Sequence, residues 1–327
     1  FRTVGDISGF TRGSFGGAVA DEFPIDGAVA VDALHHVETR KAPHGGCALS
    51  DSRTIGDRHE DLAAKEESEI AILSGYLPEA LINYVALILA REEFAQVDHR
   101  QVQVVMSVVQ PRNYATFNEV TLDAIKQLAP ARGVAVVTPG ITDADLKRFN
   151  DGGIRGIRFS LGDPRTRAVT PDMIEPLAKR VADLGWHIQF NVDGAIVMEI
   201  ESILRRLPTP MVFDHLGQPN LPAGTDDPSH KVIRDLLDQG RAWVKLSGAY
   251  SNSKAGPPAY PEATKIAQAF VKAAPERLVW GSDWPHPGVP TNKPDDAGLF
   301  DLLSEWAPDE KIRNRILVDN PAKLYGF

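Results

Sequence analysis

Residues 277–287 read Arg-Leu-Val-Trp-Gly-Ser-Asp-Trp-Pro-His-Pro, and this stretch decides the interpretation of the whole chain. Its first half is a short apolar run, typical of a buried strand in a parallel sheet. Pro285 and Pro287 cannot continue a central strand, because proline lacks the amide donor of the ladder. Asp283 is therefore predicted to stand where a buried strand ends and a stiff loop begins, which is where catalytic residues of parallel α/β folds collect. The alternative is an Asp that only caps the next helix.

Apolar runs alternate with helical patterns along the rest of the chain. The strand candidates are 28–36, 103–109, 133–138, 154–160, 187–192, 211–215, 242–247 and 278–283. The helical patterns fall near 117–129, 142–150, 171–185, 195–207, 229–240 and 260–274, with further helical material between 60 and 94. This alternation predicts an α/β fold, a single (β/α)8 TIM barrel over 28–327, preceded by an irregular N-terminal arm over 1–27. An open doubly wound sheet is the alternative.

Composition limits the function classes. The formal charge of −9 argues against nucleic acid or an anionic membrane as a partner, whereas a small anionic substrate responds to the local field of its site. Cys47 is the single cysteine, so no disulfide forms within the chain, which fits the cytoplasm. The apolar stretch 84–90 is too short to span a bilayer. We expect a cytoplasmic protein and leave homo-oligomerisation open.

Polar residues gather at the predicted carboxyl ends of the strands. They are His35 and His36, Arg158, Asn191 and Asp193, Asp214 and His215, Lys245 and Ser247, and Asp283. Because these ends meet at one mouth of a barrel, we expect the side chains to converge on a site there. Side chains alternate along a strand, so only one of Asp214 and His215 is expected to point inward.

Four residues near these ends have separate interpretations. Arg158 ends an apolar strand and needs a buried partner or a ligand; its forked guanidinium suits a carboxylate, so we predict that it anchors a substrate. Lys245 is expected to pair with an acid in the barrel ahead of any contact with substrate. His286 either lines the pocket or orients Asp283. His187 begins its strand, far from the mouth, and is expected to be structural.

Several motifs, in order from about Val102 to Phe327, resemble the amidohydrolase superfamily, in the branch of 2-pyrone-4,6-dicarboxylate lactonase and related lactone hydrolases. They are Val108–Pro111, Gly153–Phe159, Gly185–His187, Phe213–Gly217, Trp243–Tyr250, the Asp283 stretch and Ile316–Pro321. The resemblance implies a TIM-barrel hydrolase that opens a small carboxylated lactone, of the kind met in the degradation of aromatic compounds.

The resemblance also implies roles for individual residues. His36 matches the second histidine of the His-x-His motif on strand one, but Leu34 stands where the first belongs. His215 matches the strand-six histidine and Asp283 the strand-eight aspartate. Asp283 would be the general base, while His215 and His36 would stabilise the oxyanion.

The pattern departs from the family at the residues that bind substrate and metal. Gln218 stands where the pyrone lactonase has an arginine, Asn191 where it has a tyrosine, and Ser251 near a further arginine position. Arg158, Asn191, Lys245 and His286 remain the expected substrate-binding set, for a substrate other than that dicarboxylate. No cofactor is required on this interpretation; a divalent metal such as zinc, if bound, would take His36, His215 and Asp283.

Two alternatives to the lactone hydrolase stay open. The first is a metal-dependent decarboxylase of the same superfamily. The second is a barrel that has lost catalysis and only binds a ligand, which the replacement of a family histidine by Leu34 favours.

Overall fold

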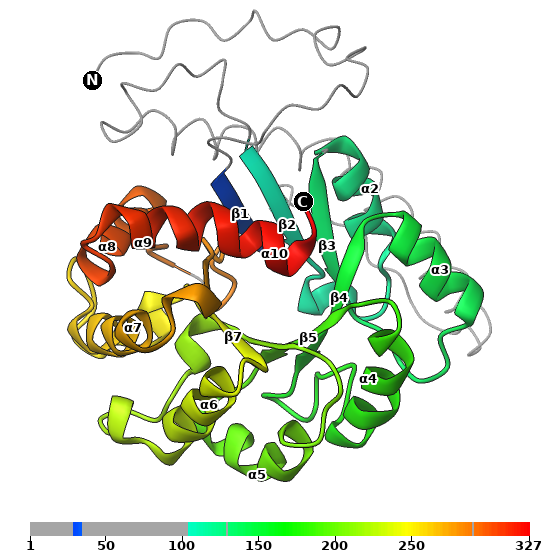
Figure 1. Ribbon diagram of the computed structural model, residues 1–327, viewed down its shortest axis with the longest axis horizontal. Coiled ribbons are helices and arrows are strands. Elements are labelled where there is room, and N and C mark those ends of the chain that lie inside the picture. The colour runs from blue at the N-terminus through cyan, green and yellow to red at the C-terminus, as the bar shows by residue number, and fades with distance from the viewer. Residues whose placement is uncertain (1–28, 35–103, 129, 290) are drawn as a thin grey trace, which may run out of the picture.

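A computed structural model describes residues 29–34, 104–128, 130–289 and 291–327 of the chain. In this part of the chain, parallel strands form one curled sheet whose order follows the sequence, with helices around its outside (Figure 1). The strands are β1 (Val29–Leu34), β2 (Val104–Val109), β3 (Ala131–Ala135), β4 (Ile154–Ser160), β5 (His187–Asn191), β6 (Met211–Phe213), β7 (Ala242–Leu246) and β8 (Leu278–Trp280).

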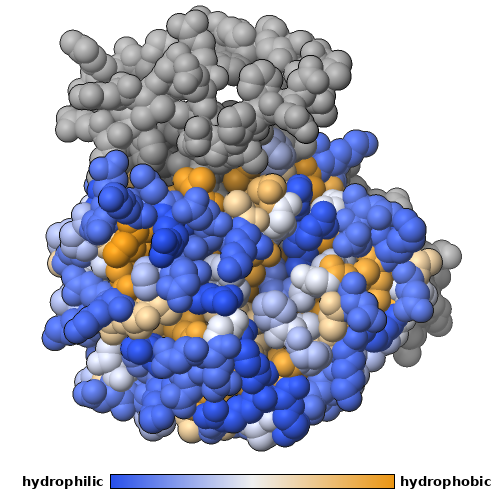
Figure 2. All heavy atoms as spheres, viewed as in Figure 1, coloured by the Kyte–Doolittle hydropathy of each residue, from blue (hydrophilic) through white to orange (hydrophobic). Residues whose placement is uncertain are grey.

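A helix follows each strand from β2 to β8. The helices are α2 (Glu119–Gln127), α3 (Asp143–Asp151), α4 (Ile174–Ala182), α5 (Gly194–Leu204), α6 (Pro228–Asp238), α7 (Pro261–Ala273), α8 (Asp296–Trp306), α9 (Glu310–Asn314) and α10 (Asn320–Tyr325). None of the helices in the described ranges is long and apolar enough to cross a membrane. Polar residues cover most of the face shown in Figure 2, with apolar residues in patches between the helices.

The predicted alternation of strands and helices is confirmed, and the sequential strand order excludes the doubly wound alternative. In the described residues, each strand pairs in parallel with the next one along the chain, from β1–β2 to β7–β8. β1 also contacts β8. A hydrogen-bonded pairing of β8 with β1, which would close the ring, stays a prediction. The proposed N-terminal arm and the helical material at 60–94 lie outside the described residues.

The two faces of the sheet carry different residues. Outward-facing residues such as Ile157, Phe190 and Val244 join the main hydrophobic core between strands and helices. Several inward-facing positions on β4, β5 and β7 are polar or charged and almost fully buried, among them Arg158, Gln189 and Lys245. Because successive residues of a strand point to opposite faces, one apolar run supplies both the core and the lining of the barrel interior.

The C-terminal helix α10 closes the interior at the amino ends of the strands. Leu324 packs against inward residues there, among them Val212 and Val134. The Asn320 side chain donates hydrogen bonds to the carbonyls of Pro275 and Leu278, at 2.8 and 2.6 Å, and so ties α10 to the start of β8. The ring of His187 meets Tyr325 edge-on, with centroids 5.5 Å apart. His187 therefore lies at the closed end, as expected for a structural residue.

Burial of His187 makes stability depend on pH. Burial lowers the pKa of His187 from 6.5 to about 3, so the folded protein keeps this ring neutral, while the unfolded chain protonates it near pH 6.5. The unfolded state then binds more protons, and stability falls as the pH drops through this window. We expect wild type to lose about 2 kcal/mol more than His187→Leu between pH 7 and 5 in urea unfolding. Equal losses in the two proteins would contradict this.

Candidate active site

Residues that directly follow β6, β7 and β8 come together at the carboxyl end of the sheet. His215 opens a short 3-10 turn after β6, Ser247 follows β7, and Asp283 lies just beyond β8. Tyr250 belongs to the 3-10 turn Ala249–Ser251. The convergence predicted from the strand ends is therefore present for these three strands.

His215 and Asp283 face each other at this mouth. His215 Nε2 lies 3.7 Å from Asp283 Oδ1. The other ring nitrogen, Nδ1, is 2.9 Å from the hydroxyl of Ser247, while the hydroxyl of Tyr250 donates a hydrogen bond to Asp283 Oδ2. His215 is 7% exposed and Asp283 6%. In each of these two side chains, one polar atom contacts a neighbouring hydroxyl. The second polar atom faces the opposite member of the His215–Asp283 pair.

The backbone leaves the extended conformation at these residues, which changes where their side chains point. His215 has a φ of 52° and Asp283 a φ of 57°. As expected, only one of Asp214 and His215 points inward: Asp214 enters the barrel interior, and His215 turns over the mouth. Because β6 ends at Phe213, His215 is no longer part of a pleated strand, and its positive φ directs the ring across the mouth.

Gly248 leaves the space that the His215 ring occupies. A Cβ at Gly248 would lie 2.9 Å from His215 Nδ1 and 3.0 Å from its Cβ, and the φ of Gly248 is +61°. The side-chain amide of Asn252 donates to the carbonyls of both His215 and Gly248, at 2.9 and 3.0 Å. The loops after β6 and β7 are thereby held together, and the position of the imidazole depends on both.

We expect Gly248→Ala to lower kcat/KM about 10–100-fold, because a catalytic group displaced by about 1 Å loses much of its effect. Steady-state kinetics on the purified variant measure this. Gly256→Ala is the matched control, since Gly256 also has a positive φ, +73°, but an added Cβ there meets nothing within 4 Å. Backbone strain is then common to both variants. Equal activities in the two would show that Gly248 does not position His215.

His286 in the loop after β8 lies between Tyr250 and Asp296, the first residue of α8. His286 Nε2 lies 2.8 Å from Asp296 Oδ1, and the His286 ring meets Tyr250 edge-on with centroids 5.5 Å apart. Burial, together with the charge of Asp283, raises the pKa of Tyr250 well above its usual range. The phenol therefore stays protonated and remains a donor to Asp283. The His286 ring contacts Tyr250, which in turn holds Asp283, and the two roles of His286, lining the pocket and orienting Asp283, stay predictions.

A buried ionic group lies in the interior of the barrel. Asp214 Oδ2 accepts hydrogen bonds from Arg158 Nε and Nη2, at 3.1 and 3.0 Å, and from Gln189 at 3.1 Å, while Asp214 Oδ1 is 2.9 Å from Lys245 Nζ. Burial by itself raises the pKa of Asp214, but the charges of Lys245 and Arg158 outweigh it and hold the pKa well below its usual range. Asp214 is therefore ionised, between two cations.

This group bears on the predicted substrate-binding residues. Lys245 pairs with an acid in the barrel, as expected. Arg158 has in Asp214 the buried partner that it needs, so a ligand is not required to satisfy it. Asn191 lies at the end of β5, where its side-chain oxygen accepts a hydrogen bond from Gln218 at 3.0 Å. Gln218 and Asn191 are two of the positions at which the sequence departs from the pyrone lactonase that it resembles. This hydrogen bond links their side chains.

His36, the remaining predicted catalytic residue, lies outside the described residues. Within the described ranges, no cluster of three His, Cys, Asp or Glu side chains is arranged to hold a metal ion. A catalytic zinc normally has three protein ligands, and the described part of the chain offers only His215 and Asp283 at this mouth. These two residues alone do not fit a zinc site.

Tyr250 and Asp296 are parts of the site that sequence reasoning missed. Tyr250 ends Trp243–Tyr250, one of the motifs that resemble the family. It lies beyond the end of β7, so strand alternation does not predict where its side chain points. Asp296 begins α8 and contacts His286, ten residues earlier in the chain. Their contacts with Asp283 and His286 depend on the course of loops that have no periodicity to interpret.

Comparison with known proteins connects this geometry to a family. A 2-pyrone-4,6-dicarboxylate hydrolase of Comamonas testosteroni is 33% identical over 227 residues, 67% of this chain and 74% of that protein. A 4-sulfomuconolactone hydrolase of Rhizobium radiobacter is 33% identical over 223 residues, 67% and 74% of the two chains. The crystal structure of a probable 2-pyrone-4,6-dicarboxylic acid hydrolase from Acinetobacter baumannii, with citric acid bound, superposes with a TM-score of 0.60 at 28% identity, over 68% of this chain and 83% of that one.

The family model described as amidohydrolase matches residues 31–327, which includes every described strand from β2 to β8 and the residues His215 and Asp283. The relatives named above are hydrolases of cyclic acids or lactones. With the parallel strands, their sequential order and the polar mouth, this match establishes that the chain belongs to the amidohydrolase family of enzymes.

Proposed function

We propose that this protein hydrolyses a small lactone that carries an acid group. The observation that carries the proposal is the pair of His215 and Asp283, whose Nε2 and Oδ1 atoms lie 3.7 Å apart at the carboxyl ends of β6 and β8. Two atoms at that spacing can both come within hydrogen-bond distance of the same reacting group, one as a base and one as a donor. Relatives that act on lactones, among them a D-galactarolactone isomerase of Agrobacterium fabrum at 30% identity, support this substrate class.

In the proposed reaction, Asp283 removes a proton from water as the oxygen attacks the lactone carbonyl. Tyr250 holds Asp283 Oδ2, so Oδ1 is the basic atom that faces the site. His215 Nε2 donates to the oxyanion that forms, while Ser247 at Nδ1 keeps the ring in place. The ring C–O bond then breaks, and the leaving oxygen takes the proton from Asp283. The product is the open hydroxy acid, which contains the lactone plus one water.

A panel of carboxylated, sulfonated and neutral lactones, assayed by acid release with a pH indicator, tests the proposal. We expect acid release from at least one anionic lactone and no release of carbon dioxide. Carbon dioxide from a carboxylated compound would instead establish the decarboxylase. Binding of an anionic lactone by calorimetry without any turnover would establish a ligand-binding barrel.

The same panel tests the requirement for metal. Leu34 occupies the position of a family histidine, and loss of one imidazole weakens a zinc site. We expect the protein, dialysed against a chelator, to contain no stoichiometric zinc and to keep its activity on a responsive lactone. Elemental analysis and activity before and after dialysis measure this. About one zinc per chain that survives dialysis, or activity restored only by added zinc, would contradict it.

A further inference from the structure

We propose that Asp296, the first residue of α8, is a positioning residue for the base Asp283. It holds His286, and His286 fixes Asp283 in two ways, through the phenol of Tyr250 and through a backbone turn. This inference rests on the proposed role of Asp283 in lactone hydrolysis. It extends the site from the mouth of the sheet to the start of a helix on its outside (Figure 1).

The carboxylate of Asp296 reaches His286, while a neighbouring residue caps the helix. Asp296 Oδ1 lies 2.8 Å from Nε2 of His286. The cap of α8 is Asp295, whose carboxylate accepts hydrogen bonds from the amides of Ala297 and Gly298, at 3.3 and 3.1 Å. Because an ionised carboxylate only accepts hydrogen bonds, Nε2 of His286 is the donor in its contact with Asp296. Asp296 is therefore available to act on the loop after β8.

The imidazole of His286 connects Asp296 to Tyr250. His286 is 2% exposed, so its ring cannot move without displacing the atoms packed around it. The ring meets that of Tyr250 edge-on, with centroids 5.5 Å apart and planes at 89°. The Tyr250 hydroxyl donates to Asp283 Oδ2, while Oδ1 faces His215. A shift of the imidazole is therefore passed to the phenol and from there to the carboxylate.

A backbone turn joins His286 to Asp283 a second time. The amide of His286 donates to the carbonyl of Asp283 at 2.7 Å, and the φ angles of the two residues are 58° and 57°. Lys293 Nζ donates to the carbonyls of Pro285 and His286, at 2.7 and 3.2 Å. Residues other than glycine keep such φ angles only where the surrounding contacts hold them. The hydrogen bond between Asp296 and His286 is one of these contacts.

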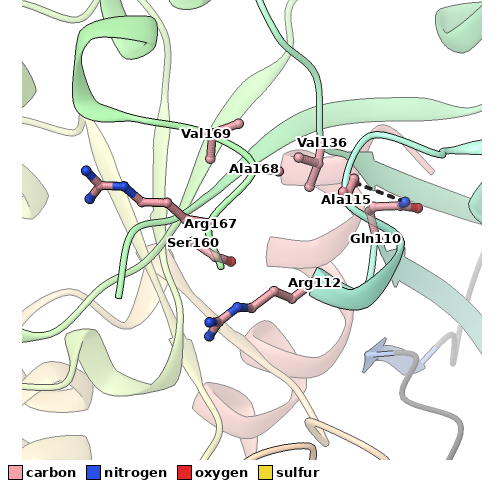
Figure 3. A pocket seen from close by; sticks show the side chains of 8 residues that line it. All are labelled: Gln110, Arg112, Ala115, Val136, Ser160, Arg167, Ala168 and Val169. Atoms are coloured by element: carbon pink, nitrogen blue, oxygen red, sulfur yellow. Dashed lines mark hydrogen bonds between the residues drawn. The ribbon is translucent and has the colours of Figure 1, made fainter. Parts of the chain in front are cut away.

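Asp296 is expected to affect the base and not the binding of a ligand in the shallow pocket of Figure 3. That pocket lies at the carboxyl ends of β2, β3 and β4, where Gln110, Val136 and Ser160 line it. Neither Asp296 nor His286 belongs to its lining. Loss of Asp296 should therefore lower kcat and leave KM nearly unchanged, since the base is displaced while contacts with the substrate remain.

Steady-state kinetics on a responsive lactone test the role of Asp296. We expect Asp296→Ala to lower kcat about 10–50-fold, with KM within about twofold of wild type. Asp296→Asn should keep kcat within about threefold, since the amide still forms a hydrogen bond with Nε2 of His286. Equal losses in the two variants would overturn the inference. Asp309→Ala is the matched control, because it removes a carboxylate from the start of the next helix, α9, where Asp309 caps the amide of Lys311; kcat should stay unchanged.

A double variant tests whether Asp296 acts through His286. His286→Asn removes the imidazole, and asparagine tolerates the φ of 58° at this position. We expect the double variant of His286→Asn with Asp296→Ala to lower kcat no further than His286→Asn alone, since the second substitution removes a contact that is already lost. Two losses that multiply would mean that Asp296 acts by another route, and would overturn the inference.

Fluorine NMR of protein labelled with 3-fluorotyrosine separates this inference from the proposed reaction, because it needs no turnover. Tyr250 is one of six tyrosines, and its signal is identified by its loss in Tyr250→Phe. A shifted Tyr250 signal in Asp296→Ala and His286→Asn, with Asp296→Asn and Asp309→Ala like wild type, supports the positioning of Tyr250 even where no lactone is hydrolysed; the lactonase proposal alone would then fail. An unchanged Tyr250 signal in Asp296→Ala would overturn the inference, whatever the activity.

Discussion

Asp283→Asn is expected to lower kcat for lactone hydrolysis by about 10²–10⁴-fold, because it removes the proposed general base while keeping the shape of the side chain. The Asn oxygen can still accept the hydrogen bond from Tyr250 that Asp283 Oδ2 accepts. Asn also tolerates the φ of 57° at this position, since it enters the left-handed region more readily than most residues. The loss should therefore lie in kcat, with KM and the melting temperature close to wild type.

Asp295→Asn is the matched control for this variant. Asp295 lies in the same segment after β8 and caps α8 by accepting hydrogen bonds from Ala297 and Gly298, a role that Asn can also fill. It removes the same formal charge without touching His215 or Tyr250. If folded Asp283→Asn kept most of the activity of Asp295→Asn, another group would have to be the base.

Asp214→Asn is expected to lower the free energy of unfolding by about 3–5 kcal/mol, because it leaves Arg158 and Lys245 buried without their counter-charge. The side chains of Asp214 and Arg158 are 0% and 3% exposed, so water cannot replace the lost carboxylate. Urea unfolding at pH 7 measures the change. A second variant, Asp214→Asn with Lys245→Met, removes one of the two orphaned cations and should recover part of the loss.

An exposed pair provides the comparison for Asp214. Asp235 lies 3.2 Å from Lys231, whose side chain is 78% exposed, and such pairs contribute about 0–1 kcal/mol. Asp235→Asn should therefore change stability by less than about 1 kcal/mol. A similarly small effect of Asp214→Asn would mean that the interior cations are neutral or solvated, and that the ionic group does not hold the barrel together.

The strand–helix alternation was predictable because each buried strand is a short apolar run and each helix a longer amphipathic one. The predicted ends were less accurate: the strand expected at 133–138 is found at Ala131–Ala135, and the strand expected at 278–283 ends at Trp280. Strand ends depend on where the ladder pairs stop and where φ becomes positive, as at His215 and Asp283. Neither property follows from the hydrophobicity of single residues.

Some residues of the candidate site were also predictable from the sequence, and others were not. Asp283 and His215 were identifiable because polar residues after apolar runs must lie at one end of parallel strands. Their partners Tyr250 and Asp296 were not, because loops without a periodic pattern bring them to the site. Arg158 shows the opposite case: its need for a partner was clear from its place in an apolar strand, but that its partner is Asp214 is a matter of tertiary contact.

The class of fold, the order of its strands and the end at which polar groups collect are predictable from the chain, since they follow from local hydrophobic periodicity and the common direction of parallel strands. Which charges neutralise each other in the interior, and which remain at the mouth, depends on contacts that form only in the folded protein. That choice depends on distances of a few ångströms between residues far apart in the chain, such as the 2.9 Å between Lys245 and Asp214.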